Sequence, residues 1–253
     1  MRSALMWRLH RHLATVVGVL VAVSACTDTR PSSSAATRPD PAAANVAPAP
    51  AAAIAPTPSP ATRPRIVFLG DSLTAGYGLA PNQSVPALVQ ARIEQEDLGY
   101  EVVNAGVSGD TSAGGLSRLD WSLEGNVRVL VVELGANDGL RGLPVAAMKD
   151  NLDTILARAR ARGIAVLLTG MEAPPNYGQA YTVEFRAAFR DLAKAHRVAF
   201  VPFYLEGVAG NPDLNIADGI HPNPEGARIV EQTIWRALRP LLAADQGPGS
   251  GDR

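Results

Sequence analysis

Four short polar blocks contain the residue types that nucleophilic chemistry at a carbonyl group requires. They are residues 70–78 (GDSLTAGYG), 104–111 (NAGVSGDT), 135–139 (GANDG) and 218–223 (DGIHPN). A serine hydroxyl is a weak nucleophile until a general base takes its proton, and the oxyanion formed next needs fixed hydrogen-bond donors. Together the blocks supply a hydroxyl, an imidazole, carboxylates, an amide and glycine backbone. Taken singly, each block consists of ordinary turn residues.

His221 is the best candidate for the general base. The chain has four histidines, and two of them, His10 and His12, lie in an amino-terminal segment that is expected to be removed. His196 follows a predicted helix, where a histidine commonly only stabilises the helix end. His221 follows Asp218 by three residues on a loop that contains glycine and ends at proline. One turn can therefore carry both the base and the carboxylate that orients it.

Elements that could position these blocks begin at residue 65. Apolar segments at residues 65–69, 100–107, 127–134, 165–169 and 199–204 are typical of parallel strands buried on both faces. Between them lie helical stripes that we expect to pack on the sheet. The stripes are Met148, Leu152, Ile155, Leu156 and Ala159; Phe185, Phe189, Leu192 and Ala193; and Val230, Ile234, Leu238 and Leu241. The order predicts one three-layer α/β/α domain with a five-stranded parallel sheet, and a site beyond the carboxyl ends of its strands.

Charge and cysteine content exclude several classes of protein. Residues 65–253 carry 17 basic and 22 acidic side chains, a net charge of −5. Binding to nucleic acid, which needs a clustered basic face, is therefore not expected. A single cysteine allows neither an intramolecular disulfide nor a cysteine-rich zinc site.

The four blocks, in this order and at successive strand ends, resemble those of the GDSL or SGNH hydrolase family. The similarity covers residues 65–240 and is strongest to the bacterial thioesterase, arylesterase and lysophospholipase subfamily, through GDSLTAGYG, SGDTS and ELGANDGLRG. It implies a flavodoxin-like sheet and the hydrolysis of carboxylic esters without a metal or another cofactor. The chain has no Gly-x-Ser-x-Gly motif, so the α/β-hydrolase fold is not indicated.

The resemblance assigns roles to individual residues. It implies a catalytic triad of Ser72, His221 and Asp218, with Asp213 as the rival carboxylate. The implied oxyanion donors are the backbone N–H groups of Ser72 and Gly109 and the side-chain amide of Asn137, with Gly106 as the rival glycine. Asp71, Asp110 and Asp138 are expected to order the loops as hydrogen-bond acceptors. Residues 172–178 resemble the acyl-pocket loop of the subfamily, or form a plain turn.

The amino terminus has the features of a lipoprotein signal. A basic segment, residues 1–12, precedes 13 uncharged residues, which are too few to cross a bilayer but suit a secretory signal. Val23-Ser24-Ala25-Cys26 resembles the bacterial lipobox, which implies cleavage before Cys26 and a lipid on its sulfur. Ordinary signal peptidase, which would release a soluble protein, and a buried structural cysteine are the alternatives. Because Thr27 rather than aspartate follows, the expected location is the cell envelope, at the outer membrane.

Composition divides the chain into four parts. After the signal peptide, residues 1–25, the lipidated Cys26 and a disordered linker fill residues 26–64. Residues 27–64 hold nine prolines and twelve alanines but no aromatic residue, so they cannot bury enough apolar surface to fold. The hydrolase domain is expected at residues 65–243, followed by a flexible tail at residues 244–253.

The sequence leaves other functions open. Within the same chemistry, the chain could be a carbohydrate acetylesterase acting on envelope or plant polysaccharide. From another class, it could be a catalytically inert envelope-binding lipoprotein. A phosphate-binding flavodoxin-like module is disfavoured, because no lysine or arginine lies between Gly70 and Gly78. The expected partners are therefore an acyl ester, lysophospholipid or thioester substrate, and the membrane through the lipid on Cys26.

Overall fold

The computed structural model describes residues 63–246. The predictions for the signal peptide, Cys26 and nearly all of the linker lie outside the described residues. At the other end, the last helix continues to Gln246, beyond the predicted end of the domain at residue 243. No helix between residues 63 and 246 combines the length and the hydrophobicity needed to cross a membrane.

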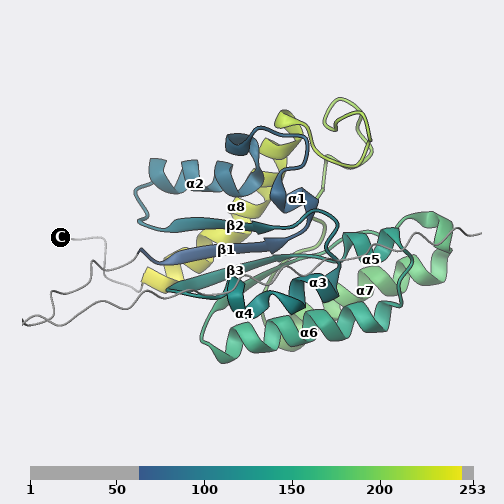
Figure 1. Cartoon of the computed structure of the whole chain (residues 1–253), viewed down its shortest axis with the longest axis horizontal. Helices are drawn as coiled ribbons and strands as arrows, with labels where there is room; N and C mark the ends of the chain where they lie inside the picture. The colour runs from purple at the N-terminus through teal and green to yellow at the C-terminus, as the bar shows by residue number, and fades with distance from the viewer. Residues whose placement is uncertain (1–62, 247–253) are drawn as a thin grey trace, which may run out of the picture. The chain divides into compact units, whose positions relative to one another are not determined.

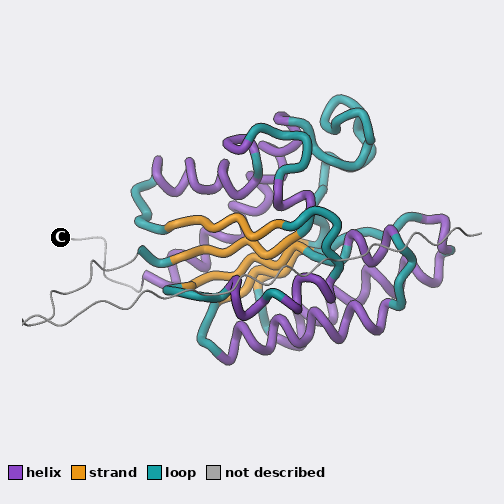
Figure 2. Tube along the Cα trace, viewed as in Figure 1, coloured by secondary structure: helices purple, strands orange, loops and turns teal. Residues whose placement is uncertain are grey.

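Five parallel strands form a single sheet in the order β2-β1-β3-β4-β5. Figure 2 shows the strands in orange, with helices on either side. They are β1 (Arg65–Gly70), β2 (Glu101–Gly106), β3 (Val127–Glu133), β4 (Ala165–Thr169) and β5 (Ala199–Val201). The chain moves outward from β1 to β2 and then returns past β1 to β3. This is the flavodoxin-like strand order, in which ligands bind beyond the strand ends where the direction reverses. The prediction of a five-stranded parallel sheet is confirmed.

Helices cover both faces of the sheet, as Figure 1 shows. Helices α2 (Val85–Gln95) and α8 (Pro224–Gln246) pack together on one face, and α6 (Val145–Ala161) and α7 (Gln179–His196) pack together on the other. Short elements lie in the connections between the strands and the long helices. They are α1 (Ser72–Ala75), α3 (Ser112–Ser117), α4 (Leu119–Ser122), α5 (Ala136–Leu140) and the 3₁₀ turns η1 (Pro81–Gln83) and η2 (Pro175–Tyr177).

The core lies between the sheet and the long helices. The predicted stripes of α6 and α7 are buried at every position, and strands β1 and β3 are buried along almost their whole length. In α8 the predicted Leu241 is partly buried and packs against the core, and the neighbouring Leu242, which the prediction omits, is fully buried. Strand β5 ends at Val201 rather than at Tyr204, because Pro202 has no N–H to continue the ladder.

Candidate active site

The turn after β1 places Ser72 at the start of a short helix. Asp71 caps α1, and its Oδ1 accepts the N–H of Leu73 at 3.0 Å. The preceding residue must be glycine, because a Cβ on Gly70 would overlap the side chain of Thr74. The strand therefore turns directly into the helix and presents Ser72 at the carboxyl end of the sheet.

Ser72, His221 and Asp218 form one chain of hydrogen bonds. The Oγ of Ser72 lies 2.8 Å from Nε2 of His221, although 149 residues separate them in the sequence. Nδ1 of the same ring lies 2.7 Å from Oδ2 of Asp218. When Nδ1–H donates to the carboxylate, Nε2 is left to accept the serine proton. The ring of Tyr77 lies against the imidazole, with 4.7 Å between the ring centroids.

Backbone donors keep Asp218 ionised. Its Oδ1 accepts the N–H of His221 at 3.0 Å and the N–H of Ile220 at 2.9 Å. These two bonds, with a smaller contribution from the imidazole, lower the pKa of Asp218 from 3.8 to about 2. The carboxylate is therefore charged at neutral pH and can stabilise a protonated His221.

His196, the alternative base, and Asp213, the alternative carboxylate, make contacts outside the chain of hydrogen bonds from Ser72 to Asp218. Nε2 of His196, at the end of α7, pairs with Oδ1 of Asp153 on α6 at 2.7 Å. Asp213 contributes its backbone carbonyl, which accepts the side-chain N–H of Asn223 at 2.7 Å. Both nitrogens of His221 have other partners, Asp218 and Ser72, so the carboxylate of Asp213 does not pair with this ring.

The three implied oxyanion donors come from three successive strand ends. Within residues 63–246, the backbone N–H groups of Ser72 and Gly109 donate to no protein acceptor. Asn137, on α5 after β3, donates one side-chain N–H to Oδ2 of Asp71 at 2.9 Å. That bond fixes the amide and leaves its second N–H for another acceptor.

The two candidate glycines of the second block have different roles. Gly106 ends β2 against α1, and a Cβ there would lie 2.7 Å from the Cα of Ala75, so this glycine serves close packing. Gly109 has a φ of +85°, which favours glycine, and the nearest atom to a Cβ there would be an Arg141 nitrogen at 3.8 Å. The open position of Gly109 leaves its backbone accessible to a substrate.

Two buried carboxyl groups, those of Asp71 and Glu133, lie close to Ser72. Oε2 of Glu133 accepts the hydroxyl of Thr74 at 2.8 Å and the N–H of Asp71 at 3.2 Å. Burial, reinforced by the nearby Asp71, raises the pKa of Glu133 well above its usual value. Burial also raises the pKa of Asp71, against hydrogen bonds from Leu73, Glu133 and Asn137. Burial therefore disfavours the charged form of Glu133 more strongly than that of Asp71.

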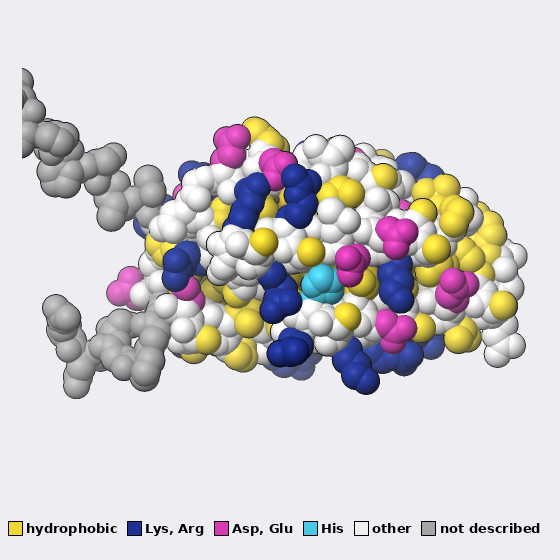
Figure 3. Space-filling model, turned by 90° about the horizontal axis from the view of Figure 1, so that it is seen from below, with side chains coloured by type: hydrophobic (Ala, Val, Ile, Leu, Met, Phe, Trp, Pro, Cys, Tyr) yellow, Lys and Arg dark blue, Asp and Glu magenta, His cyan; other side chains and the backbone are white. Residues whose placement is uncertain are grey.

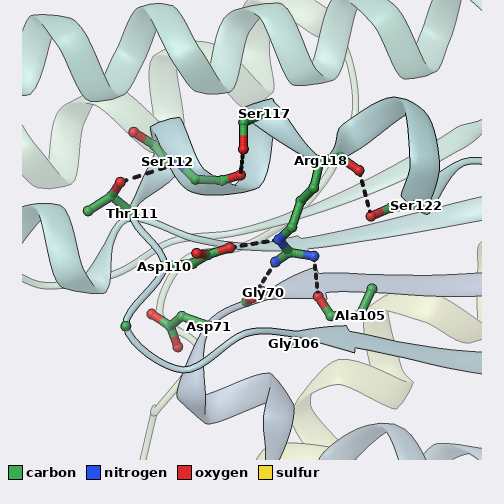
Figure 4. A network of polar contacts seen from close by, with 12 residues as sticks. Gly70, Asp71, Ala105, Gly106, Asp110, Thr111, Ser112, Ser117, Arg118 and Ser122 are labelled. Atoms are coloured by element: carbon green, nitrogen blue, oxygen red, sulfur yellow. Dashed lines mark hydrogen bonds and ion pairs between the residues drawn. The ribbon is translucent and has the colours of Figure 1, made fainter. Parts of the chain in front are cut away.

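The loop after β2 is held by a network of polar contacts (Figure 4). The guanidinium of Arg118, which follows α3, contacts the carboxylate of Asp110 and the backbone carbonyls of Ala105 and Gly70. Asp138 accepts both the N–H and the hydroxyl of Ser112, at 2.8 and 2.6 Å.

The expectation that Asp71, Asp110 and Asp138 order the loops is confirmed by these bonds. Arg118 was missed, although its sequence context offers a weak signal. It is a lone cation next to the small residues of 112–117 (SAGGLS).

An open groove of 530 Å³ begins beside the candidate triad. Three of its lining residues, Leu73, Ala136 and Ile220, immediately follow or precede Ser72, Asn137 and His221 in the sequence. Its other lining residues are Leu140, Met171, Glu172, Ala173, Pro174, Pro175, Phe203, Leu205, Ala209, Gly210 and Gly219. Most are apolar, so the groove suits an apolar chain bound at the reacting centre.

The segment of residues 172–178 forms one wall of the groove. Its turn η2 is bound to the end of α5, because the hydroxyl of Tyr177 donates to the carbonyl of Leu140 at 3.0 Å. Glu172 pairs with Arg186 of α7 at 2.7 Å. Residues 172–175 therefore line the groove, and the segment is held at both ends.

No cluster of three or more histidine, cysteine, aspartate or glutamate residues within 63–246 could hold a metal ion.

Comparison with known proteins identifies the family. Residues 68–229 match the GDSL-like Lipase/Acylhydrolase family. The chain is 44% identical over 178 residues to Esterase TesA of Pseudomonas aeruginosa, covering 70% of this chain and 89% of that protein. It is 38% identical over 181 residues to Thioesterase 1/protease 1/lysophospholipase L1 of Escherichia coli K12, covering 71% and 86%.

The fold agrees with this assignment. The crystal structure of TesA superposes with a TM-score of 0.67, at 44% identity, over 70% of this chain and 99% of that one. The chain belongs to the GDSL-like lipase/acylhydrolase family of SGNH hydrolases, and it is a hydrolase of ester or thioester bonds.

Proposed function

We propose that the chain hydrolyses acyl esters and acyl thioesters through a serine-bound acyl intermediate. The observation that carries this proposal is the continuous chain from Ser72 Oγ to His221 Nε2, at 2.8 Å, and from His221 Nδ1 to Asp218, at 2.7 Å. Ser72 attacks the acyl carbon while His221 takes the serine proton. The carbon–oxygen or carbon–sulfur bond then breaks, and His221 gives that proton to the departing alcohol or thiol.

Deacylation repeats the sequence with water. His221 takes a proton from the water molecule, whose oxygen attacks the acyl carbon, and the proton returns to Ser72 as the carboxylic acid leaves. In both steps the N–H groups of Ser72 and Gly109 and the free N–H of Asn137 stabilise the tetrahedral oxyanion. The charged Asp218 stabilises the imidazolium that forms each time.

The groove supports an acyl chain as the part of the substrate that is recognised. The groove is lined mostly by apolar residues, and its volume of 530 Å³ is larger than the volume that an acetyl group occupies. Aryl esters, lysophospholipids and acyl thioesters are therefore the proposed substrate classes. The relative from Escherichia coli has a name that includes both thioesterase and lysophospholipase activity. A carbohydrate acetylesterase would leave most of the groove without a role.

Two measurements on purified residues 63–253 test the proposal. A fluorophosphonate probe should label the wild type and fail to label Ser72→Ala. Octanoyl p-nitrophenyl ester should be hydrolysed with a higher kcat/KM than the acetyl ester. A wild-type protein that resists the probe would be an inert binding protein, and a strong preference for acetyl would indicate the acetylesterase.

We also propose that the protein is secreted and anchored to the cell envelope through a lipid on Cys26. The support is the sequence alone: the only cysteine follows Val23-Ser24-Ala25 at the end of an uncharged segment. Two or more acyl chains would give stable attachment to a membrane. The expected location is the outer membrane. Cys26→Ser should move the protein from the membrane pellet to the soluble fraction. A variant that still pellets would show that the anchor lies elsewhere.

A further inference from the structure

Arg118 joins three segments that meet at the candidate site. Its Nε lies 2.6 Å from Oδ2 of Asp110, and its two terminal nitrogens donate to the carbonyls of Ala105, at 2.6 Å, and Gly70, at 2.8 Å. Figure 4 shows the guanidinium lying between the ends of β1 and β2 and the loop that follows β2. The side chains of Arg118 and Asp110 are only 16% and 18% exposed.

Two of these three contacts lie next to the proposed backbone donors of the oxyanion hole. Gly70 is two residues before Ser72, and Asp110 directly follows Gly109. The N–H groups of Ser72 and Gly109 come from different strand ends, yet both must point at one oxygen atom. A guanidinium that binds Gly70 and Asp110 at once fixes the distance between the two donors.

The local sequence allows Arg118 to reach this position. Thr111 caps α3, accepting the N–H of Gly114. A Cβ on Gly114 would lie 2.7 Å from Oδ1 of Asp110, so a glycine is needed for the carboxylate to approach the helix. Helix α3 ends at Ser117, and the side chain of Arg118, its C-cap residue, extends toward the strand ends (Figure 4).

Only arginine can make this set of contacts. The guanidinium is planar and carries donors in a rigid fork, whereas the lysine ammonium is a compact charge on a flexible stem. A lysine at position 118 could keep the ion pair with Asp110 but could not also bind both carbonyls in the same plane. Substitution by lysine therefore separates the charge of Arg118 from its geometry.

We propose that Arg118 is a positioning residue that sets the spacing of the oxyanion donors of Ser72 and Gly109. It contacts neither the substrate nor the reacting atoms, and it acts through the two backbone segments that it joins. This inference rests on the proposed serine mechanism. It predicts that the loss of Arg118 impairs stabilisation of the oxyanion specifically.

The decisive variant is Arg118→Lys, measured with an ester and with the matching thionoester. Sulfur is a weaker hydrogen-bond acceptor than oxygen, so the thionoester depends less on the oxyanion donors. Displaced donors should lower kcat for the ester by about 10- to 100-fold, with KM nearly unchanged. The ratio of ester to thionoester turnover should fall, because the thionoester loses less.

Arg128 provides a matched control. It makes two bonds to Asp245, at 2.8 and 2.6 Å, and the same carboxylate accepts the hydroxyl of Tyr100, so this arginine also joins distant segments. None of these residues lies in the candidate site. Arg128→Lys should lower Tm without changing the ratio of ester to thionoester turnover.

Asp110→Asn keeps the proposal testable if Arg118→Lys fails to fold. It removes the charge opposite Nε while the two carbonyl contacts remain, so it should lower the ratio by a smaller factor. An unchanged ratio in every variant of positions 118 and 110 that folds would overturn the inference. The proposed function fails separately, if the wild type lacks esterase activity or Ser72→Ala retains it.

Discussion

Two histidine–aspartate pairs with the same 2.7 Å separation lie in different regions of this molecule. His221 and Asp218 lie at the carboxyl end of the sheet, and His196 and Asp153 join the helices α7 and α6. His221 binds its carboxylate through Nδ1 and turns Nε2 toward Ser72. His196 uses Nε2 for the carboxylate itself. The pair alone therefore does not make a catalytic base, because the second nitrogen must also meet a nucleophile.

The surroundings of the two pairs differ as well. Asp218 accepts two backbone N–H groups, and the groove and the amide of Asn137 lie beside the same end of the sheet. The surface over α6 carries interspersed basic and acidic side chains (Figure 3), and His196 is not among the residues that line the groove of 530 Å³. We interpret the second pair as a structural contact between two helices.

The most direct test of this comparison removes each imidazole in turn. His221→Ala should lower kcat for a p-nitrophenyl ester by roughly 10⁶-fold, since the serine then has no base. His196→Ala should leave kcat unchanged and alter the free energy of unfolding by about 1 kcal/mol or less. Steady-state kinetics and urea denaturation of both variants measure these effects. Equal losses of activity would contradict the distinction.

Removing the charge of each carboxylate should give a smaller contrast. Asp218→Asn keeps the shape of the side chain but favours the wrong tautomer of His221 and no longer stabilises the imidazolium. We expect kcat to fall by roughly 10⁴-fold. Asp153→Asn is the matched control and should retain full turnover. A triad that depends on Asp213 instead would show only a minor loss in Asp218→Asn.

The proposed oxyanion donors lie only at the carboxyl end of the sheet, beside His221, and not beside the pair formed by His196 and Asp153. Asn137→Ala should lower kcat by about 10²- to 10³-fold while leaving the fold intact, because one fixed donor is lost from the transition state. Asn151→Ala is a useful control, since Asn151 donates to the hydroxyl of Ser112 at 3.0 Å, away from the triad. Circular dichroism and Tm establish folding, and near-normal turnover in Asn137→Ala would refute its role.

Local sequence patterns predicted most of the site but not its supports. The blocks around Ser72 and Asn137 directly follow β1 and β3, and apolar periodicity located the ends of those strands. His221 lies well beyond the end of β5 at Val201, just before α8, and the sequence identified it by its three-residue spacing from Asp218. Arg118 contacts Gly70, which is 48 residues away in the chain, and Glu133 contacts Thr74, which is 59 residues away. Such contacts depend on how strands are ordered in the sheet, and no local pattern encodes them.

The differences at element ends have a similar origin. The predicted stripe of α8 ends at Leu241, three residues after Leu238, and this leucine is partly buried against the core, whereas Leu242, four residues after Leu238, is fully buried. Both spacings lie on one helical face, so periodicity alone does not choose between them. Burial against the sheet decides which leucine is covered.

The smallest expected effect concerns stability in acid. The pKa of Asp218 is about 2 in the folded protein, below its ordinary value of 3.8, so the ionised carboxylate favours the folded state. This contribution is fully present above about pH 4 and is lost as the pH falls through about 2. Because Asp218 is exposed to solvent, the contribution is small.

The free energy of unfolding of wild type minus that of Asp218→Asn should therefore shrink between about pH 4 and pH 2. A difference that stays constant over this range would show that the backbone donors bind the amide as well as they bind the carboxylate. In that case the loss of activity in Asp218→Asn would be due to the tautomer of His221 and its missing counter-charge, not to a loosened turn.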